Sequence, residues 1–338
     1  MKTFFHFRKF SKPPAAGKIA VEFYLILSNR VFEIVENFLE NVTRPLLAVV
    51  GPTASGKTEV SIRVAEKFDG EIINSDSRQM YEFLDISTAK ITESEARKIP
   101  HHLFSFLKPD EKFSVAQWKT LAEKKTREIL LREKLPILCG GTGFFVNSLV
   151  ENYKFISAAR DETFRENLEE FSTAELWEKF CEELKKFRGE FPKKIGPHDR
   201  AKIIRGLEIL LKNSVAPRDK KTRPEFESLI LGIAVRRDEI YEKINLRVLQ
   251  MLENGLLAEV ENLLKMGFKK SDPGMISHGV PECVDFLRGE ISRAEFISKM
   301  QQNTRNFAKR QLTWWRRNSN VVWFDPRNFE IVQNCELP

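Results

Sequence analysis

The chain has 338 residues, and 42% of them are hydrophobic, which is enough for one large domain or two modest domains with a real core. Its 55 Lys and Arg exceed its 48 Asp and Glu, so the formal net charge of +7 favours an anionic partner. The four cysteines form no CxxC pair, which argues against a disulfide framework and a cysteine-rich zinc site and indicates a reducing compartment. No apolar run approaches the roughly 20 residues needed to span a bilayer.

Residues 1–45 form an N-terminal extension for which the sequence gives no role. Its first 30 residues resemble a signal peptide, but Glu22 interrupts the apolar part and no small-x-small cleavage site follows. In the stretch VFEIVENFLENV, apolar residues recur at helical spacing. We therefore expect a short amphipathic helix over 31–42 that lies on the following domain.

The rest of the chain alternates between apolar runs and helical patterns. A parallel sheet with helices on both faces explains that alternation, so the predicted fold class is α/β. The strand candidates are 46–50, 71–75, 135–141, 229–235 and 321–324. A long helical pattern over 238–267 breaks near Gly255, and a last helix covers 293–315.

One segment, 158–197, is charged and helical in pattern and contains no strand candidate. We interpret it as a small all-helical insertion. It divides the sheet domain into a first part, 46–157, and a second part, 198–338, which includes the basic C-terminal helix.

The segment GPTASGKT follows the first strand and precedes a helix, as a P-loop does. Backbone N–H groups of such a loop point at phosphate oxygens, the lysine neutralises charge, and the threonine can hold Mg²⁺. The alternative is a chance glycine-rich turn. The residues concerned are Gly51, Pro52, Thr53, Ala54, Ser55, Gly56, Lys57 and Thr58.

Asp76 follows the second strand, at the carboxyl edge where open α/β sheets bind ligands. It is a candidate general base near the phosphates, although a carboxylate that caps the next helix would look the same. The chain has no guanine-reading NKxD element, and the strand ending in PILCGGT carries no Walker-B carboxylate.

The glycine-rich stretch CGGTGFF follows the third strand candidate, in the same position relative to its strand as the P-loop. Gly140, Gly141 and Gly143 would let the backbone approach a ligand, and Thr142 offers a hydroxyl. A tight strand-to-helix turn is the alternative. His101 and His102 lack metal-ligand spacing with other candidates, so we interpret them as structural.

The C-terminal segment TRNFAKRQLTWWRRN contains five cations, no acid and interleaved aromatic residues. Arg305, Lys309 and either Trp315 or Arg316 fall near one helical face, which suits a nucleic-acid backbone. A solvated basic helix is the alternative. Arg310 belongs to the same segment.

Taken in order, these motifs resemble those of the tRNA dimethylallyltransferases over about residues 46–325. Besides the P-loop, the resemblance rests on NSDSRQMY, DISTAKIT, PHHLFSFLKPDEKFSVAQW, PILCGGTGFFVNSL, HDRAKIIRGLEI and TRNFAKRQLTWW. It implies a P-loop NTPase-like core and transfer of a dimethylallyl group from dimethylallyl diphosphate to N6 of the adenosine 3′ to the anticodon, in tRNAs that read codons beginning with U.

The resemblance also assigns roles to residues. The P-loop and Arg247 would hold the diphosphate with Mg²⁺ at Thr58, Asp76 would be the general base, and Thr142 would lie near the reacting centre. The insertion would clasp the anticodon stem-loop. Ser77, Arg78 and Gln79 match the family segment that contacts tRNA beside the catalytic aspartate. Further expected tRNA contacts are Arg165, Lys202 and Arg205. A bacterial-type cytoplasmic enzyme, monomeric by analogy, is implied.

The chain departs from the family at one stretch, where Gly279-Val280-Pro281-Glu282 stands in place of a Gly-Tyr-Lys/Arg-Glu/Gln sequence that contacts tRNA. An aromatic and a basic contact are absent there. Two rival functions stay open at this point. One is a P-loop kinase for a small molecule or nucleotide, and the other is a tRNA-binding protein without catalytic activity.

Overall fold

The structure is a computed structural model that describes residues 30–155, 162–187, 195–212, 223–329 and 331–332. The signal-like stretch 1–29 lies outside the described residues. The chain divides into two compact units, a core unit formed by Met1–Val150 with Pro224–Pro338 and an insert unit formed by Glu151–Arg223. Among the described residues, none of the helices combines the length and the apolarity that crossing a bilayer requires.

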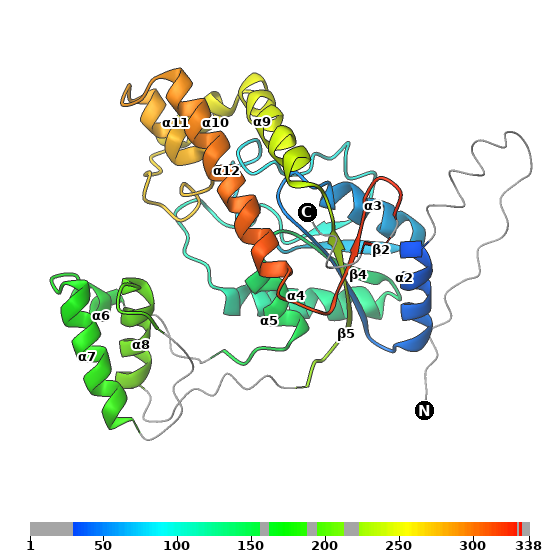
Figure 1. Cartoon of the computed structure of the whole chain (residues 1–338), viewed down its shortest axis with the longest axis horizontal. Coiled ribbons are helices and arrows are strands. Elements are labelled where there is room, and N and C mark those ends of the chain that lie inside the picture. The colour runs from blue at the N-terminus through cyan, green and yellow to red at the C-terminus, as the bar shows by residue number, and fades with distance from the viewer. Residues whose placement is uncertain (1–29, 156–161, 188–194, 213–222, 330, 333–338) are drawn as a thin grey trace, which may run out of the picture. The chain divides into compact units, whose positions relative to one another are not determined.

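The core unit is built on a parallel six-stranded sheet (Figure 1). The strand order across the sheet is β3-β2-β4-β1-β5-β6. The strands are β1 (Pro45–Val50), β2 (Gly70–Asn74), β3 (His101–His102), β4 (Leu135–Cys139), β5 (Glu227–Ile233) and β6 (Val321–Phe324). The predicted α/β fold with a parallel sheet is confirmed, and the five predicted strands are present with ends shifted by at most two residues.

Both faces of the sheet are covered, since every residue of β1, β2 and β4 is buried. Alternate residues of β1 enter two separate apolar clusters: Leu46 and Ala48 join one, and Leu47 and Val49 join the other. On the second side lie α2 (Arg30–Asn41), α3 (Lys57–Phe68) and the first half of α9 (Arg237–Glu253). On the first side lie α4 (Val115–Leu131), α5 (Gly143–Val150), α10 (Leu256–Lys265), α11 (Val280–Leu287) and α12 (Arg293–Trp315).

The helix expected over 31–42 is α2, and its buried Val31 and Val35 pack on the second cluster. This part of the predicted 1–45 extension therefore belongs to the core unit. The expected break near Gly255 separates α9 from α10, and Gly255 has a φ of 97° that favours glycine. The sequence did not predict β3, which pairs with β2 through Ile72 and His101.

The insert unit contains α6 (Glu162–Glu166), α7 (Thr173–Lys186) and α8 (Arg200–Lys212). The predicted boundaries of 158–197 are too narrow, and the assignment of α8 to the core is wrong. The physical reason is the apolar face of α8: Ile203, Leu207 and Leu210 are buried in the same cluster as Leu176 and Phe180 of α7.

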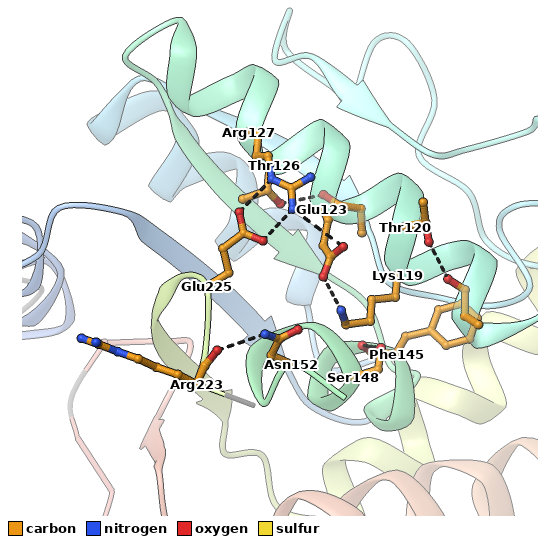
Figure 2. A network of polar contacts seen from close by, with 12 residues as sticks. Lys119, Thr120, Glu123, Thr126, Arg127, Phe145, Ser148, Asn152, Arg223 and Glu225 are labelled. Carbon is orange, nitrogen blue, oxygen red and sulfur yellow. Dashed lines mark hydrogen bonds and ion pairs between the residues drawn. The ribbon is translucent and has the colours of Figure 1, made fainter. Parts of the chain in front are cut away.

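Glu225 and Glu227 form hydrogen bonds to other parts of the core unit where the chain enters β5. Glu225 accepts hydrogen bonds from Arg127 of α4 at 2.7 and 2.6 Å (Figure 2). Arg44 also donates to Glu225 at 2.6 Å. Glu227 accepts from the backbone N–H of Thr43 and of Arg44. Because β5 pairs with β1 from Pro45 onward, these contacts set the register of the central strand pair.

Candidate active site at the carboxyl edge of the sheet

Three loops that the sequence singled out begin side by side at the carboxyl edge of the sheet. Val49 of β1 and Asn74 of β2 both pair with Cys139 of β4, so the loops that follow these strands start at one level. Ligands of open parallel sheets bind at this edge. The structure thus brings together the P-loop, Asp76 and Thr142.

The P-loop has the backbone of an anion cradle. Gly51, Ala54 and Gly56 adopt positive φ angles of 149°, 63° and 91°. Gly56 precedes α3 with no side-chain cap, so the first N–H groups of the helix are not satisfied by a capping side chain. No heavy atom lies within 4 Å of the position that a Cβ of Gly56 would take. The loop therefore leaves room beside donors that favour a phosphate.

Two partly desolvated cations belong to this site. Burial, together with the positive charge of Arg247, lowers the pKa of Lys57 to about 8, while Cys139 and Asp76 act in the opposite direction. The Lys57 ammonium donates to the carbonyl of Pro52 at 2.7 Å. Burial also lowers the pKa of Arg247, which lies on α9. A pair of cations that burial has stripped of water favours an anionic ligand.

Asp76 is held in place by its neighbours. Its N–H donates to Asn74 Oδ1 at 2.8 Å, and its Oδ1 accepts the N–H of Arg78 at 2.9 Å. The alternative role as a cap is thus met in part, although the carboxylate caps a turn and no helix begins there. The second oxygen, Oδ2, faces the glycine loop, since a Cβ on Gly141 would lie 3.7 Å from it.

The glycine loop after β4 packs directly against the Asp76 loop. A Cβ on Gly140 would lie 2.5 Å from the backbone nitrogen of Asp76, so only glycine fits there. Thr142 Oγ1 accepts the N–H of Ser77 at 3.0 Å and forms a 3.3 Å hydrogen bond with the Ser77 hydroxyl. Thr142 therefore lies beside the loop that carries Asp76, and its place near the reacting centre stays a prediction.

The residues predicted to contact tRNA beside Asp76 also have structural partners. Arg78 donates to the carbonyl of Pro273 at 2.9 Å. The side-chain amide of Gln79 donates to the carbonyls of Thr88 and Ala89 at 3.0 and 3.1 Å. Both side chains therefore fix loops around the site, and their contact with tRNA stays a prediction.

The structure of α12 decides between the two residues predicted as the last member of its basic face. Trp315 is fully buried and lies on the core-facing side together with Phe296 and Met300, whereas Arg316 is exposed. Lys309 and Arg310 are exposed, whereas Arg305 donates to Asn245 Oδ1 at 2.6 Å and to Gln302 at 2.8 Å.

In the insert unit, two of the predicted RNA contacts surround a buried carboxylate. Glu208 is fully buried and accepts from Arg165 at 2.6 and 2.8 Å and from Arg205 at 2.9 Å. Glu208 was not predicted from the sequence, although its position three residues after Arg205 on a helix could have indicated an ion pair. Lys202 forms an ion pair with Asp199 at the surface.

Two further residues near the site, Gln311 and His278, were not predicted from the sequence. Gln311 of α12 is hydrogen-bonded to both the P-loop and the glycine loop. The His278 ring centroid lies 4.4 Å from that of Phe307, and burial, with the cations of Arg78 and Arg310, lowers the pKa of His278. A lone histidine and a lone glutamine have no motif spacing that would single them out.

At the stretch that departs from the resemblance, the side chains face the interior of the protein. Val280 is fully buried, and Glu282 accepts from the N–H of Gly279 at 3.1 Å and from Asn303 at 2.5 Å. The stretch begins α11, with Pro281 in its first turn. Its local role is to start and anchor a helix.

The site residues fit a magnesium ion that a ligand's phosphates would hold. Thr58 is exposed in the first turn of α3 and offers one hydroxyl oxygen. Within the described part of the chain, no group of three or more His, Cys, Asp or Glu could hold a metal. Mg²⁺ commonly keeps its waters and binds through substrate phosphates and one or two protein oxygens, so a single hydroxyl suffices.

The fold and the site define a class of protein: a parallel α/β protein whose P-loop and two buried cations lie next to a carboxylate and a glycine-rich loop. The model of the IPP transferase family matches residues 79–318. A protein from Thermoanaerobacter sp. (strain X514), named tRNA dimethylallyltransferase, is 39% identical over 298 residues, which cover 85% of this chain and 95% of the relative. A namesake from Staphylococcus epidermidis is 39% identical over 305 residues, covering 87% and 90%.

Solved structures agree with these sequence relatives. A tRNA isopentenylpyrophosphate transferase from Bacillus halodurans superposes with a TM-score of 0.64 at 36% identity, over 84% of this chain and 90% of that one. A eukaryotic dimethylallyltransferase acting on tRNA superposes with a TM-score of 0.72 at 25% identity, over 84% and 74%. The chain belongs to the tRNA dimethylallyltransferase family and is a prenyltransferase.

Proposed function

We propose that this enzyme transfers the dimethylallyl group of dimethylallyl diphosphate to N6 of the adenosine 3′ to the anticodon, in tRNAs that read codons beginning with U. The observation that carries the proposal is the juxtaposition of an anion cradle, with Lys57 beside it, and the carboxylate of Asp76. Relatives that match most of the chain carry the corresponding name.

The P-loop binds the diphosphate as a leaving group in this proposal. N6 attacks the allylic C1, the bond between C1 and the diphosphate oxygen breaks, and the diphosphate departs with the bonding electron pair. Lys57 and Arg247 stabilise the negative charge that develops on the departing oxygen, because that charge grows in the transition state. Their partial desolvation strengthens this interaction. A bound Mg²⁺, with Thr58 as protein ligand, would supply further charge neutralisation.

Asp76 accepts the proton that N6 loses as the new C–N bond forms. One of its oxygens is bound by the N–H of Arg78, and the other faces Gly141. The exocyclic amine of adenine is a weak nucleophile, so removal of its proton during attack lowers the barrier. Thr142, which is hydrogen-bonded to Ser77, positions the loop that faces the base.

The tRNA is the anionic partner that the net charge of +7 favours. The target base lies in a single-stranded loop, where unstacking it costs little. The insert unit clasps the anticodon stem-loop, and Lys309 and Arg310 on α12 contact its phosphates. We propose a cytoplasmic, monomeric enzyme.

The test is mass spectrometry of nucleosides from unmodified tRNA incubated with the protein, Mg²⁺ and dimethylallyl diphosphate. The proposal expects one prenyl unit on the adenosine beside the anticodon, and no gain on a tRNA in which that adenosine is replaced by guanosine. Asp76→Asn should abolish turnover and leave tRNA affinity within about twofold, because amide and carboxylate have the same shape. The control Asp272→Asn changes a carboxylate whose partner is the backbone of Lys269.

The same assay separates the two rival functions. A kinase would form ADP from ATP in proportion to a small acceptor and would leave tRNA unprenylated. A catalytically silent tRNA-binding protein would bind tRNA without prenyl gain, and Asp76→Asn would change nothing measurable.

A further inference from the structure

One buried side chain joins the two loops on which the proposed reaction depends. Gln311 of α12 is 5% exposed. Its amide oxygen accepts the N–H of Thr53 in the P-loop at 2.7 Å, and its amide nitrogen donates to the carbonyl of Gly141 at 3.0 Å. Both halves of the amide are thus used, each by a different loop.

The hydrogen bond to Thr53 occupies one of the backbone N–H donors of the P-loop. Because the N–H of Thr53 is bound by Gln311, a diphosphate is held by the N–H groups that follow it and by Lys57. The Thr53 end of the loop is fixed by the protein itself. An N–H that is already paired within the protein does not have to reorganise when the ligand binds.

The bond to Gly141 extends the connection to the general base. Gly141 is followed by Thr142, whose hydroxyl holds the N–H of Ser77, and Ser77 follows Asp76. Hydrogen bonds and short backbone links thus connect the P-loop through Gln311 to the loop that carries the carboxylate.

We propose that Gln311 is a positioning residue that sets the separation between the diphosphate loop and the Thr142 loop, and therefore the alignment of the allylic carbon with the attacking amine. The inference rests on the proposed function and deepens it. A displacement of about 1 Å between reacting groups lowers rates by about 100-fold, which makes a rigid spacer valuable.

The first experiment replaces Gln311 by methionine, which has similar length and no amide, and by glutamate, which can accept from Thr53 but cannot donate to Gly141. We expect kcat to fall at least about tenfold in both, with tRNA affinity, measured by anisotropy of a labelled anticodon stem-loop, within about twofold. The matched control is Gln250→Met, an exposed glutamine on α9. A kcat and a donor KM within twofold of wild type in Gln311→Met would overturn the inference. Equal losses of kcat, tRNA affinity and thermal stability would also overturn it.

The second experiment uses the space at Gly141. A Cβ there would lie 1.9 Å from Gln311 Nε2 and 3.0 Å from its Cδ, and the next atom, Asp76 Oδ2, is at an ordinary 3.7 Å. Gly141→Ala should therefore lower kcat strongly in the wild type and little further in a Gln311→Ala background. Additive losses in kcat would contradict a direct contact between the two residues.

A third readout does not require activity. The Thr53 amide should be protected from hydrogen exchange in the wild type and in Gln250→Met, and should exchange faster in Gln311→Met. If the wild type prenylates no tRNA, the proposed function fails. The exchange test would still show whether Gln311 binds the Thr53 amide. Equal exchange in wild type and Gln311→Met would overturn the inference whatever the activity.

Discussion

The lowered pKa of Lys57 makes donor binding depend on pH in a defined direction. With a pKa of about 8, roughly three quarters of the lysines carry a proton at pH 7.5 and roughly a tenth at pH 9. A bound diphosphate stabilises the charged form, so the protein must take up the missing proton when the donor binds. The dissociation constant of the donor should therefore rise about eightfold between pH 7.5 and pH 9.

Isothermal titration calorimetry with the unreactive thiolodiphosphate analogue of dimethylallyl diphosphate measures this effect. Buffers of different ionisation enthalpy report the proton uptake, which should approach one proton per donor at pH 9. Lys57→Met should bind weakly at both pH values and show no uptake. The control Lys67→Met, at the exposed end of the same helix, should behave as wild type. A change below twofold in wild type, or the same pH slope in Lys57→Met, would refute the reasoning.

Two further predictions concern stability. Glu225, with a pKa of about 2 because Arg127 and Arg44 donate to it, stabilises the fold above about pH 4.5 and loses this contribution as the pH falls toward 2. Glu225→Gln should lower the free energy of unfolding by about 1–2 kcal/mol at pH 7 and by progressively less below pH 4.5, in denaturant titrations; a pH-independent difference would contradict this. Arg165→Met removes the bidentate partner of the buried Glu208 and should destabilise the insert unit by about 3 kcal/mol, seen as faster proteolysis within 151–223. The control is Lys202→Met, which breaks the exposed ion pair with Asp199 and should lower the free energy of unfolding by less than about 1 kcal/mol. Equal effects of Arg165→Met and Lys202→Met would contradict the prediction.

Periodicity and turn chemistry predicted most of the core unit. Strands buried on both faces read as continuous apolar runs, and that pattern is visible in LLAVV without any structural information. By contrast, β3 consists of two histidines, and what makes it a strand is its pairing with Ile72 and Ile73. The structural interpretation of these histidines agrees with their contacts, because His102 bonds Glu71 at 2.7 Å and His101 bonds the carbonyl of Ile99.

The site was predictable where a motif imposes local geometry and unpredictable where it depends on distant contacts. The P-loop, Asp76 and Thr142 each follow a strand of one parallel sheet, so their convergence follows from topology. Gln311 lies 258 positions from Thr53 and 170 from Gly141, and nothing local marks it. The charge of Arg165 indicated an RNA contact, yet its partner Glu208 lies 43 positions away.

The two ends of the insert unit lie close together. Asn152 donates its side-chain amide to the carbonyl of Arg223 at 3.0 Å, so the chain leaves and returns almost at one point. The register of β5 against β1 is set independently by Glu227. Because the two ends of residues 151–223 meet, a change in the length or sequence of this segment does not require any strand of the sheet to shift. Under the proposed function, in which this segment clasps the tRNA, selection on RNA recognition acts on it separately from selection on the chemistry of the sheet edge.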